Sequence, residues 1–155
     1  PENFHPLGGV EQKTYFYHFF CAEPLPFVAR YGWWCKRPLA LDTFKKGLEV
    51  FKGTHDFRSY CTGDEQSSTV RTIDHIELEY LKNVRTFRVV IQAKGFLRYM
   101  IRRILGATFY VTLYDQPTER LREVLADKNP HQKLGIAPAR GLLLRRIRYE
   151  RPLLW

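Results

Sequence analysis

The segment GFLRYMIRRILGATF, residues 95–109, has the apolar spacing of an α-helix that lies against a larger surface. Arg98, Arg102 and Gly106 follow the border of its apolar face at i, i+4 and i+8. Arg103 lies away from this border on the predicted helix. At about 100° per residue, the apolar face itself collects six residues that suit a core: Leu97, Met100, Ile101, Ile104, Leu105 and Thr108. The pattern predicts a half-buried helix with guanidinium groups at the edge of a core.

Two alternating segments precede this helix and predict an antiparallel hairpin. Residues 69–80, TVRTIDHIELEY, place Ile76 and Leu78 on one face and Glu77 on the other. Residues 85–93, RTFRVVIQA, repeat the alternation after a short turn. Such alternation is typical of strands with one face in the core and the other in solvent.

Further elements are predicted on both sides of the hairpin and the helix. The expected elements are a strand at 13–20, a connector at 21–34 whose tryptophans pack on the core, a helix at 41–53 with Asp42 as N-cap, a helix at 116–130 with Pro117 in its first turn, and a strand at 141–150. This order predicts one α+β domain over residues 1–155, with helices packed on one face of an antiparallel sheet.

Positive charge is concentrated in two parts of the chain. The formal net charge is +9, and no Asp or Glu occurs between Tyr80 and Tyr114. A second basic cluster lies at residues 140–151. Segments of one sign, interleaved with aromatic residues, attract polyanions because each neutralised phosphate releases counterions. Nucleic acid is the first candidate partner; a merely solubilising face and an anionic membrane surface remain alternatives.

Several classes of protein are excluded by simpler features. No apolar run approaches the roughly 20 residues needed to cross a bilayer, and the first residues lack the pattern of a signal peptide. Cys21, Cys35 and Cys61 form no CxxC pair, so neither a disulfide framework nor a zinc site is predicted. We therefore expect no membrane-spanning segment and no zinc site, in a reducing intracellular compartment.

The dipeptide His55-Asp56 is the first candidate for metal or acid–base chemistry. A metal site needs three or four ligands, and no second cluster stands at ligand spacing. Thr54 or Asp56 could instead cap the turn that follows. The sequence favours this structural role over a metal or acid–base site. No nucleophile elbow or glycine-rich phosphate loop is present.

Tyr15, Tyr17 and Arg102 are the other candidates. The two tyrosines share one face of their strand, where they could stack on bases or belong to the core. A half-buried Arg102 needs a carboxylate, phosphate or carbonyl partner, unless its stem carries the charge to solvent. No acidic residue lies near it in sequence.

Five segments, in order, resemble the motifs of one family. They are KTYFY (13–17), FKGTHDFRSY (51–60), TVRTI (69–73), GFLRYMIRRILGA (95–107) and APARGLLLRRIRY (137–149). Their counterparts are K/R-x-Y-x-Y, L-x-G-x-H-D-F-x-S-F, T-x-R-x-I, F-L-x-x-M-V-R-x-I-V-G and A-P-x-x-G-L-x-L-x-x-V-x-Y. The chain thus resembles the C-terminal half of a TruA-type tRNA pseudouridine synthase, which implies half of a pseudouridine synthase fold.

The resemblance implies isomerisation of uridine to pseudouridine in tRNA, without a cofactor, by an enzyme that forms a homodimer. Tyr15 resembles the tyrosine that packs on the uracil, and Arg102 resembles the arginine that pairs with the nucleophilic aspartate. The basic residues expected to contact RNA are Lys13, Arg58, Arg71, Lys94, Arg98 and Arg103. A non-catalytic RNA-binding module with the same fold is the alternative.

The chain also departs from the family pattern. The family's nucleophile lies in a G-R-T-D motif, and that motif is absent from the 155 residues. Phe16 stands where the family usually has arginine. We therefore expect the chain to be part of a longer enzyme, in which the N-terminal half supplies the nucleophile, and to be inactive alone.

Overall fold

The computed structural model describes residues 9–62 and 68–150. In chain order, the strands and α-helices are β1 (Val10–Phe20), β2 (Trp33–Trp34), α1 (Leu41–Glu49), β3 (Gly53–Asp56), β4 (Val70–Leu81), β5 (Thr86–Ala93), α2 (Met100–Leu113), α3 (Glu119–Asp127) and β6 (Leu142–Tyr149). The strands form one six-stranded sheet in the order β2-β1-β5-β4-β3, and β6 also pairs with β1. Every pairing is antiparallel except that of β1 with β2.

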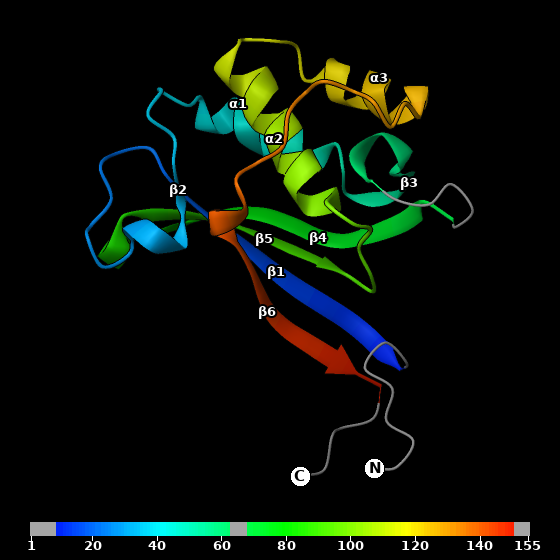
Figure 1. Cartoon of the computed structure of the whole chain (residues 1–155), viewed down its shortest axis with the longest axis horizontal. Coiled ribbons are helices and arrows are strands. Elements are labelled where there is room, and N and C mark those ends of the chain that lie inside the picture. The colour runs from blue at the N-terminus through cyan, green and yellow to red at the C-terminus, as the bar shows by residue number, and fades with distance from the viewer. Residues whose placement is uncertain (1–8, 63–67, 151–155) are drawn as a thin grey trace.

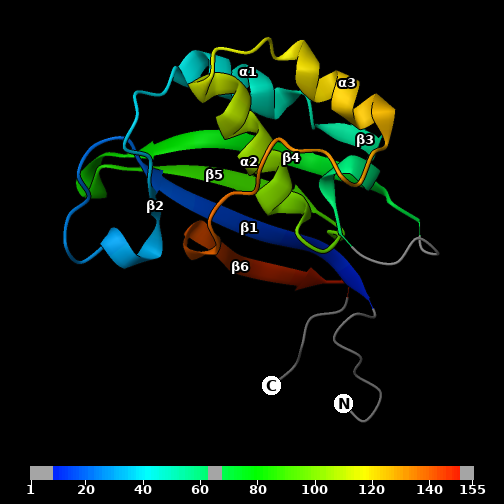
Figure 2. The same cartoon turned by 45° about the horizontal axis from the view of Figure 1, so that its top comes forward.

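The helices α1, α2 and α3 all cover the same face of the sheet, whose other face is open (Figures 1 and 2). The core lies between the two layers and includes Tyr17 and Phe19 from β1 together with Ile104 and Leu105 from α2. This arrangement confirms the predicted α+β class, with helices on one face of a mainly antiparallel sheet.

The alternation of β1 separates two sets of side chains. Tyr15 and Tyr17 stand opposite Ile91 and Val89 of β5, and Tyr17 is fully buried in the core under the helices. Phe16, between them in sequence, points to the open face because successive side chains of a strand alternate. One strand therefore supplies both the core and the open face.

The helix predicted at 95–109 is present, but it begins later and ends later. Residues 95–99 form a turn in which Met100 N–H donates to Leu97 O, and α2 starts at Met100. The chain must reverse direction after β5 before α2 can cross the sheet. Periodicity missed this turn because Leu97 is apolar and still packs against the core from outside the helix. Arg98 accordingly lies in the turn rather than on the helical border.

Three further local predictions were wrong. Asp42 lies inside the first turn of α1, after the N-cap residue Ala40, and makes no capping bond. Pro117 precedes α3 rather than standing in its first turn. The segments 33–34 and 53–56 were not expected as strands, yet they pair with β1 and β4. Such short strands form because a longer neighbouring strand offers unpaired backbone groups. That neighbour is known only from the tertiary structure, so local sequence patterns do not predict the short strands.

The segment between α3 and β6 fastens α2 to β1. Ala137 N–H donates to Arg102 O at 2.8 Å, and Tyr17 Oη donates to Pro138 O at 3.0 Å. Gly106 permits this approach, since a Cβ there would lie 2.7 Å from the Cα of Ile136. Gly141 is equally confined, because its Cβ would meet the Tyr17 ring and the carbonyl of His18.

We expect Gly106→Ala to lower the free energy of unfolding by about 1–3 kcal/mol, because its methyl group would press on backbone that cannot swing aside. Gly95→Ala is the matched control, since a Cβ there meets nothing within 4 Å. It should stay within about 0.5 kcal/mol of wild type in urea unfolding. Equal stability of the two variants would show that the approach at Gly106 is not tight.

Candidate active site

Tyr15 and Arg102, far apart in sequence, line one cavity of about 300 Å³. The cavity lies where β1, β6, the turn before α2 and the first turn of α2 meet. Its lining residues are Tyr15, Phe96, Leu97, Arg98, Tyr99, Met100, Ile101, Arg102 and Leu142. Aromatic and aliphatic walls with a few charged groups suit a planar ligand that carries polar edges.

Tyr15 forms the strand side of this cavity. Its ring meets Phe96 edge to face, with the ring centroids 5.3 Å apart. Partial burial raises the pKa of the Tyr15 hydroxyl above its usual value, because the charged phenolate is less well solvated there. Tyr17 has a different role: it is fully buried, and its hydroxyl is bonded to the carbonyl of Pro138. Of the two tyrosines, only Tyr15 lines the cavity.

Arg102 forms the helix side, and a backbone carbonyl is its partner. Its Nε donates to Ala137 O at 2.8 Å, which completes a reciprocal pair with the Ala137 N–H bond to Arg102 O. Its Cζ lies over the Tyr99 ring, 5.3 Å from the centroid. Within residues 9–62 and 68–150, neither Nη atom has a hydrogen-bond partner. The guanidinium is therefore anchored at one nitrogen and keeps two nitrogens for a further acceptor.

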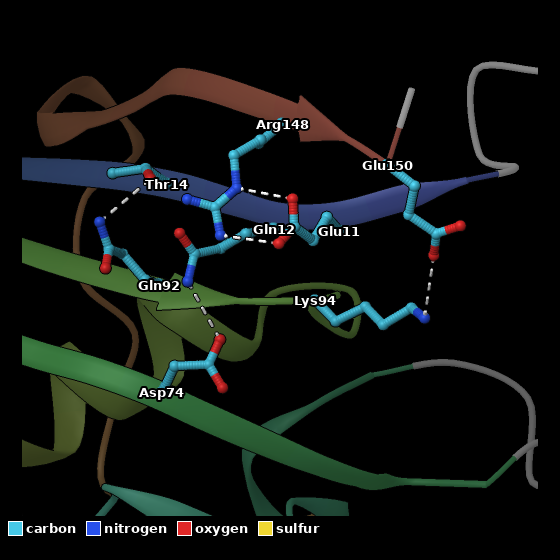
Figure 3. Close-up of polar contacts among 8 residues, drawn as sticks. All are labelled: Glu11, Gln12, Thr14, Asp74, Gln92, Lys94, Arg148 and Glu150. Carbon is cyan, nitrogen blue, oxygen red and sulfur yellow. Dashed lines mark hydrogen bonds and ion pairs between the residues drawn. The ribbon is translucent and has the colours of Figure 1, made fainter. Parts of the chain in front are cut away.

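Of the predicted RNA-contacting residues, Arg98 and Lys13 lie on the side of the sheet that holds this cavity, whereas Lys94 lies with the residues of the open face. Arg98 lines the cavity, with its Cζ 5.3 Å from the centroid of the Tyr99 ring. Lys13 shares the strand face of Tyr15, two residues away, and pairs in register with Ala93. Lys94 follows Ala93; its side chain is 79% exposed and its Nζ lies 3.9 Å from a Glu150 carboxylate oxygen. Figure 3 shows this ion pair at the end of β6.

Arg58, Arg71 and Arg103 gather elsewhere, around Cys61. Burial raises the pKa of the Cys61 thiol, and the charges of these three arginines oppose that rise. None of them lines the cavity. Arg103 bridges two segments to α2, because its Nη1 donates to Pro130 O at 2.9 Å and to Ser59 O at 3.4 Å.

The His55-Asp56 pair has a structural role, as the sequence favoured. One Asp56 oxygen accepts hydrogen bonds from the Thr69 hydroxyl and from Arg58 N–H, and the other lies 3.2 Å from Lys128 Nζ. The Thr69 bond contributes most to a lowered pKa of Asp56, and Lys128 adds to it. Across the part of the chain that the structure describes, no group of three His, Cys, Asp or Glu residues could hold a metal ion.

The open face of the sheet carries a polar network that the sequence patterns did not reveal. Glu11 receives two hydrogen bonds from the Arg148 guanidinium, at 2.8 and 3.1 Å, while the Gln92 amide donates to Thr14 Oγ1 (Figure 3). Further along this face, the Arg88 guanidinium lies over the Phe16 ring, 4.2 Å from its centroid. Thr14 and Phe16 occupy alternate positions of β1, whereas Glu11 lies at an irregularity in the pairing of β1 with β6, so only the strand pairing shows that these residues meet their partners.

No helix in the described ranges is both long and apolar enough to span a bilayer. Residues 48–150, more than half of the chain, match the family model described as tRNA pseudouridine synthase. The chain therefore belongs to the tRNA pseudouridine synthase family.

Curated relatives identify the particular branch of the family. A protein named tRNA pseudouridine synthase A from Thermotoga petrophila is 34% identical over 148 residues, which cover 95% of this chain and 60% of that protein. Its namesakes from Thermotoga neapolitana and Chlamydia felis are 36% and 29% identical, over 95% and 99% of this chain and 60% and 57% of theirs. The chain spans about 60% of the length of these relatives, and it corresponds to the C-terminal half of a TruA-type enzyme, which confirms the resemblance.

Sequence patterns missed Tyr99 and Phe96 as lining residues. Both were placed inside or beside a predicted helix, where the apolar stripe gave them no separate role. The feature of the sequence that could have indicated them is the placement of Phe96 and Tyr99 on either side of Leu97 and Arg98, shortly before Arg102 and Arg103. That feature becomes interpretable only once the turn at residues 95–99 is known.

We expect Asp56→Asn to lower the free energy of unfolding by about 1–2 kcal/mol at pH 7, because its charged hydrogen bonds are weakened. The folded-state pKa lies below the usual 3.8, so the contribution is present above pH 3.8 and is lost as the pH falls through the folded value. Urea unfolding at pH 7 and at a series of pH values below 3.8 measures this. Asp74→Asn, at an exposed position, is the control. A difference between Asp56→Asn and wild type that does not shrink as the pH falls below 3.8 would contradict the assignment.

Proposed function

We propose that this chain is a single domain that forms the C-terminal part of a tRNA pseudouridine synthase. The observation that supports this most directly is the shared cavity of Tyr15 and Arg102, the two residues that the family motifs assign to the active centre. Membership of the family supports the same reaction class.

In this proposal the N-terminal half of the enzyme supplies the nucleophilic aspartate, and the Arg102 guanidinium pairs with its carboxylate. The two free Nη atoms offer a fork of donors that matches a carboxylate. An adjacent positive charge lowers the pKa of a carboxyl group, so the pairing keeps the nucleophile ionised and oriented. The Ala137 carbonyl accepts the hydrogen bond of Nε and so anchors the guanidinium at that atom, away from the two Nη atoms.

Tyr15 acts on the base. A uridine extruded from the RNA loses its stacking, and the Tyr15 ring, held edge-on by Phe96, offers a replacement surface. The bond from the ribose to N1 breaks, the uracil turns, and a bond to C5 forms while C5 gives up its proton and N1 gains one. The reaction is an isomerisation and needs no net oxidant, reductant or cofactor.

tRNA and a second copy of the enzyme are the proposed partners. Arg98 and Lys13 extend the positive edge of the cavity, where they could neutralise phosphates next to the target uridine, and the exposed Lys94 adds positive charge on the other face of the sheet. Arg58, Arg71 and Arg103 would form a separate basic surface around Cys61. The homodimer is proposed from the family resemblance.

We expect the isolated chain to form no pseudouridine, because the G-R-T-D motif that carries the family's nucleophile is absent from its 155 residues. Incubation with unmodified tRNA, followed by quantification of pseudouridine, tests this, and the full-length protein is the positive control. Turnover by the isolated chain would overturn the claim that the nucleophile lies in the other half. If the full-length protein binds tRNA but forms no pseudouridine, the alternative of a non-catalytic RNA-binding module is correct.

In the full-length protein, Arg102→Ala should reduce kcat at least about a hundredfold, because the carboxylate loses its only proposed charge partner. Arg37→Ala is a matched control: Arg37 also donates to a backbone carbonyl, Leu113 O at 3.0 Å, and also lies over a tyrosine, Tyr114 at 4.7 Å. Its kcat should equal that of wild type. An Arg102→Ala variant that remains fully active would refute the role assigned to Arg102.

A further inference from the structure

Tyr99 occupies a backbone position that suits glycine. It has φ 61° and ψ 0°, and it is the third residue of the turn that Met100 N–H closes onto Leu97 O at 3.1 Å. This position of a type II turn favours glycine or asparagine, because a side chain in the left-handed region crowds its own backbone. A bulky aromatic residue there is unfavourable locally, so an advantage elsewhere in the molecule must offset that cost.

The other residues with positive φ do not share this setting. Arg85, Asp115 and Lys128 also have positive φ, but none of them is aromatic and none lines the cavity. Among these residues of the described ranges, Tyr99 alone places a ring at the candidate active site. Tyr99, with its left-handed backbone, is the residue immediately before α2, so its ring lies at the start of this helix.

The Tyr99 ring contacts both arginines of the cavity. The Cζ atoms of Arg98 and Arg102 each lie 5.3 Å from its centroid, within the range of a cation–π interaction. Arg102 is thereby held at two points, by the ring at Cζ and by the Ala137 carbonyl at Nε. Two constraints define the orientation of a planar group, whereas the Nε bond alone would leave it free to tilt.

We propose that Tyr99 is a positioning residue, which holds the Arg102 guanidinium so that its two Nη atoms face an incoming carboxylate. The inference rests on the proposed function and deepens it, since Arg102 is there the partner of the nucleophile. Tyr99 acts through Arg102 and takes no direct part in bond making. The ring also brings Arg98 near Arg102, and this concentration of positive charge favours an anionic group at the cavity.

The test compares substitutions at Tyr99 in the full-length protein. Tyr99→Phe keeps the ring and should keep kcat. Tyr99→Gly removes the ring while relieving the backbone, so it should unfold at no lower urea concentration than wild type and yet lose at least about tenfold in kcat, since loss of orientation costs rate. Asp115→Gly is the matched control, because it relieves a left-handed residue with φ 50° away from the cavity. It should leave kcat unchanged.

The pH dependence separates positioning from a structural role. If Tyr99→Gly loosens the pairing with Arg102, the carboxylate is less stabilised, and the acid limb of the kcat profile should shift to higher pH. A smaller folded fraction would scale the whole profile without shifting its acid limb. Full kcat in Tyr99→Gly, or a tenfold loss without the shift, would overturn the proposal.

Arg102→Ala and wild type are measured in the same series. If wild type forms no pseudouridine, or if Arg102→Ala is fully active, the proposed function fails. If both of these behave as expected while Tyr99→Gly matches wild type, only the positioning role of Tyr99 fails.

Discussion

The reciprocal pair of hydrogen bonds between Arg102 and Ala137 is the contact on which the site depends. One bond joins backbone to backbone, and the other joins the guanidinium Nε to the same residue's carbonyl. The pair fastens the segment before β6 to α2, while Pro138 and Gly141 fasten it to Tyr17 of β1. Because α2 and β1 are thus held by one short segment, Arg102 and Tyr15 face the same cavity.

The hydrogen bonds between Arg102 and Ala137 also explain how the charged Arg102 side chain is accommodated beside the hydrophobic core. Arg102 is half-buried, and among the described residues its guanidinium meets a carbonyl and an aromatic ring rather than a carboxylate. The charge therefore remains uncompensated within the described residues. An intramolecular carboxylate would have satisfied the guanidinium and removed its capacity to bind another; a neutral carbonyl partner leaves that capacity intact.

The two faces of the sheet have different roles. The face that the helices cover (Figure 2) holds the core. The cavity with Tyr15 lies on the same side, where β1, β6 and the first turn of α2 meet. The open face carries the bonds between Glu11 and Arg148 and between Thr14 and Gln92, which tie β6, β1 and β5 together (Figure 3). Alternation along β1 makes the division possible, since neighbouring residues of one strand serve opposite faces.

The sequence by itself determined the α+β class, the hairpin of β4 and β5, the buried stripe of α2 and the family, because periodicity and motif order are local properties of a chain. It also indicated Tyr15 and Arg102 through their motifs. Only the tertiary structure decided where α2 begins, that 33–34 and 53–56 are strands, which carbonyl Arg102 meets, and that Tyr99 lies between the turn and the cavity. Each of these depends on residues brought together across the fold, and no local pattern carries that information.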